Sequence, residues 1–499
     1  MGKRKREGKK YRQPVNGQTR SVSESSLEDC KIAVGDFISQ LPEDILSSIV
    51  SLLALREAAR TSILSKIWRC LWRSSLNLNF DIKNMTGDDV CLPRNRDTAL
   101  QQQEQCRFVG WVYKVLKQHA SKKIESCRVV YPLSEENHRD IDQWLELVAA
   151  KEVQELDIHL YTPKVFHHKY KLYEFPYWIF SQAGRGSSLK YLSLNLGALV
   201  PPRSFGSFSS LVSLAIKYTV LSEENVENIL SNSLCLEQFS VSHCYCPTRL
   251  KFGNGHTYLN LRHLNIIACY DLEEVEICGA IYLASFECTG AILRRLSFKN
   301  SAQPVRLCFC PVRDAVAGIP YAFFDRLATD FPQPETMFLG FSRLKDDMIP
   351  KQLPTFTKLK ELVLWIAGTF PRSLVKVISS LLKASPLLLK LQLHLPIIST
   401  ETSNITQKKK VPLEKSFQHE RLEEVEMFSF HGAQHEVELA IYLLSNMVVL
   451  RKMKIIRKTQ KYEGDGRWSA SKLPTKIKRK QVRKMLRGEV PQNAQLIVI

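Results

Sequence analysis

The sequence predicts an α/β protein in which a small all-helical module precedes an irregular solenoid, with parallel strands on its concave side and helices or turns on its convex side. Apolar residues recur at helical spacing near residue 45, and segments of the form L-x-x-L-x-L return through the middle of the chain. With 499 residues, 44% of them hydrophobic and 24% charged, the chain is long enough for both parts.

The helical module is expected within residues 36–82. Pro42 stands where a helix can begin, and Glu43 and Asp44 follow in its first turn, where acids favour the positive end of the helix dipole. A second short helix is expected after a break, and Ser65 can cap a third. The third helix presents large apolar groups at i, i+3 and i+4: Trp68, Leu71 and Trp72. About forty residues cannot bury this surface in themselves, so the module predicts a partner.

Eighteen residues of this segment fall on one motif without an insertion: Asp36, Ile38, Ser39, Leu41, Pro42, Asp44, Ile45, Leu46, Ala58, Arg60, Thr61, Ser62, Leu64, Ser65, Lys66, Trp68, Leu71 and Trp72. The segment therefore resembles the F-box in its plant form, approximately D-R-I-S-x-L-P-x-D-[IL]-L followed by A-x-x-T-[SC]-x-L-S-[KR]-R-W-x-x-L-W. Phe37 and Ile67 stand where the family usually has arginine, and Ala54 stands where it often has proline. These departures leave open a weaker affinity for the F-box partner.

The F-box resemblance implies docking on a Skp-type adaptor, which bridges to a cullin. Buried apolar and aromatic residues dominate interface energies, so the candidate adaptor-binding residues are Leu41, Pro42, Ile45, Leu46, Ile49, Leu64, Ser65, Trp68, Leu71 and Trp72. In helices this short, any one Ile or Leu is equally expected in the core of the module.

The repeats begin at regular distances in the middle of the chain. Four units start 22, 25 and 25 residues apart, inside the leucine-rich-repeat period of about 20 to 29, at Leu189, Leu211, Leu236 and Leu261. Three more follow at steps of 10 or 11 residues, which predict strand and turn without a helix: Leu272, Leu283 and Leu293. Looser units start at Ile124, Val153, Leu359, Leu388, Leu422 and Leu450. Stacking such units buries a continuous core and forms a curved binding surface.

Several stretches between the repeat units also carry predictions. Residues 222–230 and 373–382 are amphipathic and predict convex helices. Cys244 and Cys269 fall where the chain leaves a repeat strand, which indicates a structural role. The rhythm breaks at residues 300–358, which contain either a long insertion or degenerate units. The polar residues 402–410 predict an exposed loop.

The end of the solenoid has a resemblance of its own. Residues 421–455 read as another repeat, with a helix from Glu436 to Ser445, and resemble the FBD module that follows the repeats in many plant F-box proteins. Trp468 and a basic helix around Thr475 to Leu486 look like the end of such chains. The predicted division is a disordered basic arm at 1–35, the F-box at 36–82, a linker with the first helices at 83–119, the solenoid at 120–420, an FBD-like cap at 421–457 and a basic tail at 458–499.

The net charge of +20 is concentrated at the ends of the chain. Residues 1–12 carry +6 and residues 451–499 carry +12, which leaves +2 for the rest. A nucleic-acid-binding surface on the folded body is therefore not favoured. One compact cluster suits nuclear import, with a merely solvated arm as the alternative: Lys3, Arg4, Lys5, Arg6, Lys9 and Lys10. The expected location is intracellular, with the nucleus favoured over the cytoplasm.

Other classes of protein receive little support from the sequence. Apolar runs of about 18 residues are missing, and the first residues lack the apolar core of a secretory signal. Thirteen scattered cysteines predict reduced thiols rather than a disulfide framework. The cysteine pairs at 244/246 and 308/310 have the wrong spacing for zinc, and no catalytic motif is present. No metal, cofactor or enzyme activity is expected.

The resemblance implies a substrate receptor of a cullin-based ubiquitin ligase, in which the solenoid holds an unidentified target protein near the conjugating enzyme for ubiquitination and degradation. Membrane binding is not expected. Two alternatives stay open. One is a nuclear repeat scaffold that acts independently of the ligase, and the other is a small-molecule sensor of the same architecture.

Overall fold

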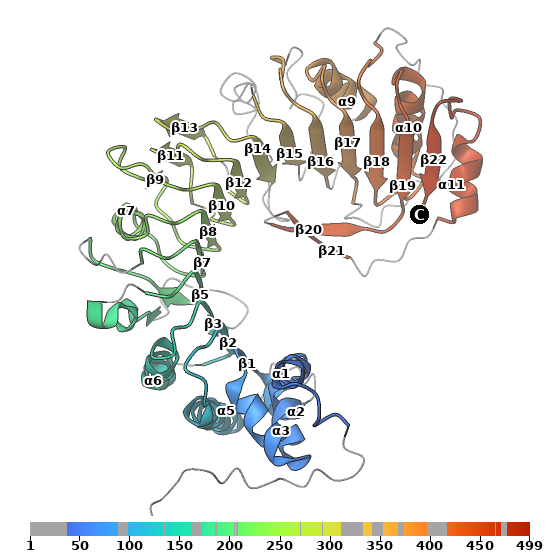
Figure 1. Cartoon of the computed structure of the whole chain (residues 1–499). Helices are drawn as coiled ribbons and strands as arrows, with labels where there is room; N and C mark the ends of the chain where they lie inside the picture. The colour runs from blue at the N-terminus through green and yellow to red at the C-terminus, as the bar shows by residue number, and fades with distance from the viewer. Residues whose placement is uncertain are drawn as a thin grey trace, which may run out of the picture.

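The computed structural model describes residues 37–499 except 88–97, 161–171, 311–332, 342–352, 368–373, 397–416, 471–476 and positions 134, 185, 186, 204, 206, 207, 270, 292 and 465. The predicted basic arm and the predicted loop at 402–410 lie outside the described residues. Figure 1 shows the described residues as a curved, open structure, in which short helices occupy one end and a long sheet curves away from them.

The N-terminal module contains three short helices, as predicted: α1 (Glu43–Ser51), α2 (Leu55–Arg60) and α3 (Lys66–Leu71). Two 3₁₀ turns follow α2 and α3: η1 (Thr61–Ile63) and η2 (Trp72–Ser74). Pro42 directly precedes α1, and the two acids lie in its first turn. The side chain of Ser65 caps α3 by accepting a hydrogen bond from the Trp68 N–H at 3.5 Å, which confirms the predicted cap.

In the described part of the chain, fifteen parallel strands form the main sheet, and each coil of the solenoid adds one strand. In order they are β1 (Asn77–Asp81), β2 (Ser126–Tyr131), β3 (Glu155–Leu160), β5 (Tyr191–Asn195), β7 (Ser213–Lys217), β8 (Gln238–Ser242), β10 (His263–Ile267), β12 (Ser285–Thr289), β14 (Arg306–Cys310), β15 (Thr336–Phe341), β16 (Glu361–Ile366), β17 (Lys390–His394), β18 (Glu424–Phe428), β19 (Lys452–Ile456) and β22 (Gln495–Val498). The register is constant: Leu214 lies opposite Leu192 on one side and Phe239 on the other. The predicted solenoid is thereby confirmed.

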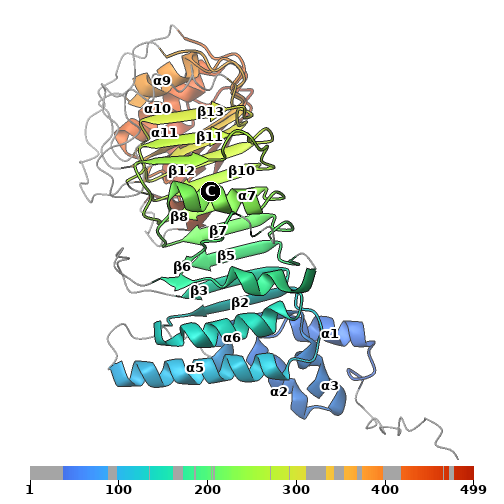
Figure 2. The same cartoon turned by 90° about the vertical axis from the view of Figure 1, so that its left-hand side faces the viewer.

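Helices cover the convex side of this sheet (Figure 2). They are α5 (Thr98–Gln118), α6 (His138–Ala149), α7 (Glu223–Asn232), α9 (Leu374–Lys383) and α10 (Gln434–Asn446). The two helices predicted from amphipathic stretches are α7 and α9. Ser222 caps α7 by accepting a hydrogen bond from the Asn225 N–H at 3.1 Å. Smaller elements are α4 (Ile82–Thr86), η3 (Glu135–Asn137), η4 (Tyr177–Gly184) and the paired strands β4 (Tyr173–Glu174) and β6 (Gly197–Ala198).

A second, three-stranded sheet replaces the helices in the middle of the solenoid. Its strands are β9 (Arg249–Phe252), β11 (Glu274–Cys278) and β13 (Arg295–Lys299). The units starting at Leu272 and Leu293 belong to this sheet and do not continue the main row. The prediction of strand and turn alone is confirmed, because these coils hold one concave and one convex strand. Glu276 lies in its centre, and hydrogen bonding from Lys299 lowers the pKa of its carboxyl to about 2.

The irregular stretch at residues 300–358 contributes strands to the main sheet. Both β14 and β15 pair in register with their neighbours, so Leu307 lies opposite Met337. Of the two alternatives, degenerate repeat units therefore describe the two strands, whereas 311–332 and 342–352 lie outside the described residues.

The C-terminal stretch, residues 458–499, contains the predicted basic helix, which is α11 (Arg479–Leu486). It also contains three strands that were not predicted: β20 (Gln460–Gly464), β21 (Arg467–Ala470) and β22. Strand β22 extends the main sheet because its alternate residues Leu496 and Val498 align with Met453 and Ile455 of β19. Apart from the half-buried Lys461, the described charged side chains of this stretch are exposed.

The terminal repeat has the predicted strand, helix and strand, which are β18, α10 and β19. Helix α10 is anchored by a buried carboxylate. The Glu436 side chain accepts backbone hydrogen bonds from His431, Gly432 and Ala433 at 2.9, 2.7 and 2.9 Å. This one side chain satisfies the donors that the start of a helix leaves unpaired.

Candidate functional site

The N-terminal module leaves large apolar side chains in solvent. Ile63 is 88% exposed and Leu52 is 87% exposed, values that are unusual for residues of this size. The other members of this group are Phe37, Ile38, Leu41, Ile45, Leu53, Leu64 and Ile67. These nine residues are called the apolar face below. Clustered exposed apolar groups mark surfaces that bind another molecule.

Short helices explain why these residues are outside. Helix α1 buries Leu46 and Val50 in the core, and it ends at Ser51, so that Leu52, its C-cap residue, is not part of a further turn that faces inward. The adjacent residues Ile63 and Leu64 lie at the turn between α2 and α3. Two neighbouring residues of a turn cannot both reach the same core, so the ends of these helices present apolar groups outward.

The ten predicted adaptor-binding residues fall into three groups. Leu41, Pro42, Ile45 and Leu64 are exposed, and Ile49 and Ser65 are half-buried. Leu46, Trp68, Leu71 and Trp72 are buried in the core of the chain. The indole N–H of Trp68 donates to the Ser39 hydroxyl at 3.0 Å. A side chain so enclosed offers almost no area to a partner, so these four hold the module together in the isolated chain.

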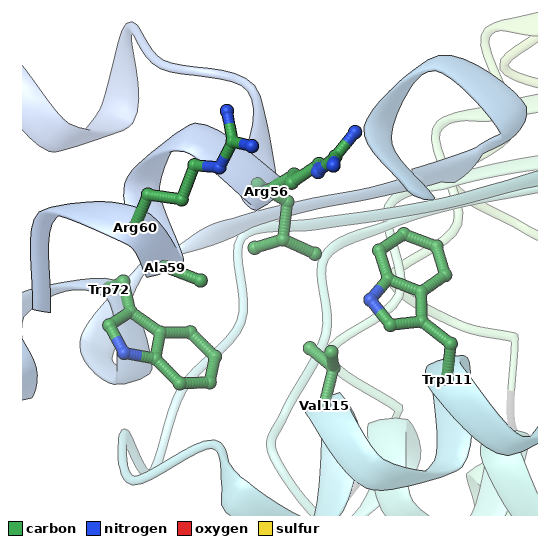
Figure 3. Close-up of a pocket in the computed structure, with 7 residues that line it drawn as sticks. Arg56, Ala59, Arg60, Trp72, Trp111 and Val115 are labelled. Carbon is green, nitrogen blue, oxygen red and sulfur yellow. The ribbon is translucent and has the colours of Figure 1, made fainter. Parts of the chain in front are cut away.

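Trp72 lies at the joint between the module and the solenoid. Its ring lines a hollow of about 300 Å³. Figure 3 shows the ring opposite Trp111 and Val115 of α5. Arg56 and Arg60 of α2 lie at the rim of this hollow. Trp72 therefore faces the first solenoid helix.

A buried hydrogen bond braces the same joint. The Asn84 side chain in α4 accepts from the Leu55 N–H at 2.8 Å, and Asp81 caps α4. Strand β1 then carries the chain directly into the main sheet through its pairing with β2. The module is thus fixed to the first coil.

The prediction from sequence missed several members of the apolar face. Leu52, Leu53 and Ile63 were outside the ten predicted residues, although consecutive apolar pairs at the ends of short helices were a usable signal. Phe37 and Ile67, which replace the arginines usual in the F-box, are exposed as well. These departures add apolar surface to the face.

The described residues contain no group of three side chains suited to a metal ion. Cys244 and Cys269 are buried at the turns that follow their strands, as predicted, and the Cys244 thiol lies 3.3 Å from the Ser242 carbonyl oxygen. Burial raises the pKa of the Cys244 thiol, which keeps it protonated. The described cysteines are free thiols. Within the described part of the chain, the helices lack the combination of length and apolar character needed to cross a bilayer.

The concave side of the main sheet has two distinct parts. Near β2 to β7 it is polar and forms a hollow of about 250 Å³, where Arg128 pairs with Asp157 at 3.1 Å and Tyr191 and Ser193 add polar groups. From β14 to β18 it is aromatic and is covered by the hairpin β20–β21 (Figure 1). These parts are called the polar half and the aromatic half below.

Comparison with known protein families agrees with this architecture. Residues 38–80 match the F-box domain, and residues 115–497 match the family described as At1g61320/AtMIF1, LRR domain. An F-box ahead of leucine-rich repeats defines an F-box/LRR protein. Since the repeat match covers more than half of the chain, the chain belongs to the At1g61320/AtMIF1 leucine-rich-repeat family, with an F-box domain at its start.

Individual relatives in Arabidopsis thaliana have low sequence identity to this chain, but the matches extend over large parts of it. The chain is 26% identical over 381 residues to F-box/LRR-repeat protein At3g03360, which covers 72% of this chain and 70% of the relative. It is 29% identical over 213 residues to F-box/FBD/LRR-repeat protein At1g13570 (42% and 44%) and 29% identical over 271 residues to putative F-box/FBD/LRR-repeat protein At4g03220 (53% and 47%). The chain spans less than half the length of the latter two.

Proposed function

We propose that this protein is the substrate-recognition subunit of an SCF-type ubiquitin ligase. An F-box domain implies binding to a Skp-type adaptor, and through it to a cullin. The observation that supports this role most strongly is the apolar face, which lies on the F-box module, largely at the ends of its helices and in its turns. Covering one large apolar side chain stabilises a complex by about 1.5 to 3 kcal/mol, so a few of these residues suffice as anchors.

The predicted docking residues divide into two roles under this proposal. The exposed Leu41, Pro42, Ile45 and Leu64 contact the adaptor, joined by Leu52 and Ile63. The buried Trp68 and Trp72 act indirectly, because they hold these exposed residues in place. The joint formed by Trp72, Trp111 and Asn84 then keeps the solenoid in a fixed direction from the adaptor.

The solenoid supplies the surface for a target protein. Proteins of the F-box/LRR class are typically non-catalytic, and the chemistry belongs to a conjugating enzyme on the same scaffold. The contribution of this chain is proximity, because a lysine held near the charged enzyme reacts as though it were highly concentrated. The polar half of the concave side, with Arg128 and Asp157 on adjacent strands, is open for such contacts.

Two finer assignments belong to the same proposal. The terminal repeat at residues 421–455 is assigned to the FBD class, which is supported by the β18–α10–β19 unit and by the names of two relatives. The basic residues from Lys3 to Lys10 are assigned to nuclear import, and they lie outside the described residues. Loss of nuclear accumulation when Lys3, Arg4, Lys5 and Arg6 become alanine tests the second assignment, and unchanged accumulation contradicts it.

A matched pair of leucine variants tests adaptor docking. Leu64, on the apolar face, is 61% exposed, and Leu234, on the solenoid, is 55% exposed. Leu64→Asp places a charge in the proposed interface, so adaptor binding measured by calorimetry is expected to weaken at least about tenfold. Leu234→Asp is expected to bind like the unaltered chain. Equal binding by both variants, or no binding by the unaltered chain, contradicts the proposal.

A further inference from the structure

The aromatic half of the concave side contains a cluster of apolar groups separate from the main core. Its buried members are Cys310, Phe338, Trp365 and Ala367, with Cys308 and Val363 beside them. In a leucine-rich repeat the concave face meets solvent or a ligand. Here, two side chains of the chain's own hairpin, Tyr462 and Trp468, cover the cluster.

The hairpin meets this surface through a pair of aromatic rings. Tyr462 and Trp468 lie directly opposite each other across strands β20 and β21. The Trp468 ring stacks on His394 with centroids 3.9 Å apart, and His394 stacks in turn on Phe428 at 4.2 Å. Phe338 meets Tyr462 edge-on at 4.6 Å. Such ring contacts add specificity to the apolar area that they bury.

A polar contact fixes the end of the hairpin. The Tyr462 hydroxyl donates to the Glu287 carboxylate on β12 at 3.0 Å. Gly464 follows with φ +88°, and a Cβ at this position would lie 2.7 Å from the Ile267 side chain. The contact therefore depends on a phenol and on a close backbone approach that a glycine allows.

The hairpin is attached in a way that permits release. In the described part of the chain, β20 and β21 pair with each other and with no strand of the main sheet. Lifting the hairpin breaks side-chain contacts but none of the backbone pairing that holds the solenoid. A two-stranded hairpin is marginally stable alone, so its order depends on this docking.

The hairpin also covers three polar groups without satisfying them. Both ring nitrogens of His394 and the indole nitrogen of Trp365 are buried and have no hydrogen-bond partner among the described residues. Buried polar groups in native proteins are nearly always paired. An occupant with a backbone carbonyl or polar side chain at this point would fit the surface better than the hairpin does.

We propose that the aromatic half, centred on Phe338, Trp365 and His394, is a binding surface that the β20–β21 hairpin occupies in cis. The occupant that displaces the hairpin is an extended segment of a protein target. It carries an aromatic ring to stack on His394, a hydroxyl donor for Glu287 and polar groups for the unsatisfied nitrogens. This inference rests on the proposed function only in assigning the surface to the target, and its test does not involve the adaptor.

The test uses a peptide in trans. The probe is a fluorescein-labelled peptide with the sequence of residues 459–470, and the receptor is the full chain carrying Tyr462→Ser and Trp468→Ser. Fluorescence anisotropy is expected to show saturable binding to this variant. Binding to the unaltered chain is expected to be about tenfold weaker or more, because its own hairpin competes at a high effective concentration. A peptide with serine at both aromatic positions is expected not to bind.

Two further measurements fix the interpretation. Adding His394→Ala to the receptor variant removes the stacking partner and is expected to weaken peptide binding roughly two- to tenfold. In the unaltered chain, amides of 460–470 are expected to exchange with deuterium at least about a hundred times faster than those of β16 and β17, because the hairpin opens locally.

Three outcomes overturn the inference: a folded receptor variant that does not bind the peptide, equal binding by both receptors, or hairpin amides as protected as the main sheet. The exchange measurement decides the matter if the double variant does not fold. If the unaltered chain does not bind the adaptor but the receptor variant binds the peptide, the proposed function is contradicted and this inference is still supported.

Discussion

The apolar face of the F-box module and the aromatic half of the concave side are two apolar surfaces outside the main core. They differ in their exposure to solvent. Leu52 and Ile63 on the first surface are open to solvent, and no described residue covers them. Phe338 and Trp365 on the second are buried beneath Tyr462 and Trp468. The difference indicates that the apolar face is available to a partner protein, whereas the aromatic half is occupied by the hairpin of the same chain.

The largest effect is expected in the core that supports the open surface. Trp68→Ala removes a buried ring and its hydrogen bond to Ser39, so opening of the helical module is expected to become easier by about 3 to 5 kcal/mol. Amide exchange in α1 and α3 measures this free energy. Trp68→Phe keeps most of the ring and is expected to cost about 1 to 2 kcal/mol. A small effect of Trp68→Ala would mean that Trp68 is not a core residue.

The covered surface is expected to respond next. Phe338→Ala removes the ring that contacts both Tyr462 and Trp468, and the free energy of hairpin docking is expected to fall by about 2 kcal/mol. Exchange of the hairpin amides measures it, with β2 and β3 as an internal reference that should not change. Unaltered hairpin exchange would contradict the assigned contacts.

A pH effect of intermediate size is expected at His394. Burial lowers the pKa of its imidazole to about 3, and the groups opposite it in the sheet, Trp365 and Phe428, carry no charge. The folded pKa lies below the unfolded value of 6.5, so between pH 6.5 and 3 the unfolded chain binds a proton at His394 that the folded chain does not. The folded state is therefore not destabilised by this group above pH 6.5, and it loses stability as the pH falls from 6.5 toward 3.

Between pH 7.5 and 5.5 the loss from this one group is expected to be about 1.4 kcal/mol. Urea titrations of the unaltered chain and of His394→Phe at the two pH values isolate it, since phenylalanine keeps a ring in the stack but takes up no proton. Equal pH dependence in both chains would show that His394 is not buried as described.

The smallest effect is expected on the open surface itself. Leu52→Ala should change the stability of the isolated chain by no more than about 0.5 kcal/mol, because its side chain has little to lose on truncation. Thermal unfolding of the chain without adaptor measures this. A loss above 2 kcal/mol would mean that the open surface is covered by another part of the same chain.

The sequence predicted the repeat strands more completely than it predicted the two apolar surfaces. Leucine spacing predicted the main-sheet strands from β2 to β12 and from β16 to β19, because each L-x-x-L-x-L unit shows locally which side chains point inward. It did not predict β14 and β15, which lie in the irregular stretch at residues 300–358. It predicted strands at Leu272 and Leu293 but not that they form a second sheet, since a strand in the second sheet shows the same alternation as a strand in the first. The contact of Trp468 with His394 joins residues 74 positions apart, and no local pattern reports it.

For the docking residues, too, the sequence predicted local structure but not which side chains are buried by packing. The motif around Pro42 and Ser65 predicted the helices and the cap, because both depend on adjacent residues. It could not separate Trp68 from Leu64, since both are apolar and only the packing of three short helices decides which is enclosed. Leu52 and Ile63 were missed although each belongs to a pair of consecutive apolar residues at the end of a short helix.

The measurement that tests the central claim most directly is amide hydrogen exchange of the intact chain with and without a purified Skp-type adaptor. Protection is expected in residues 43–71, which carry most of the apolar face, while exchange of β20 and β21 should stay unchanged. Protection confined to the solenoid, or no protection at saturating adaptor, would contradict the claim that the open apolar surface is the docking site.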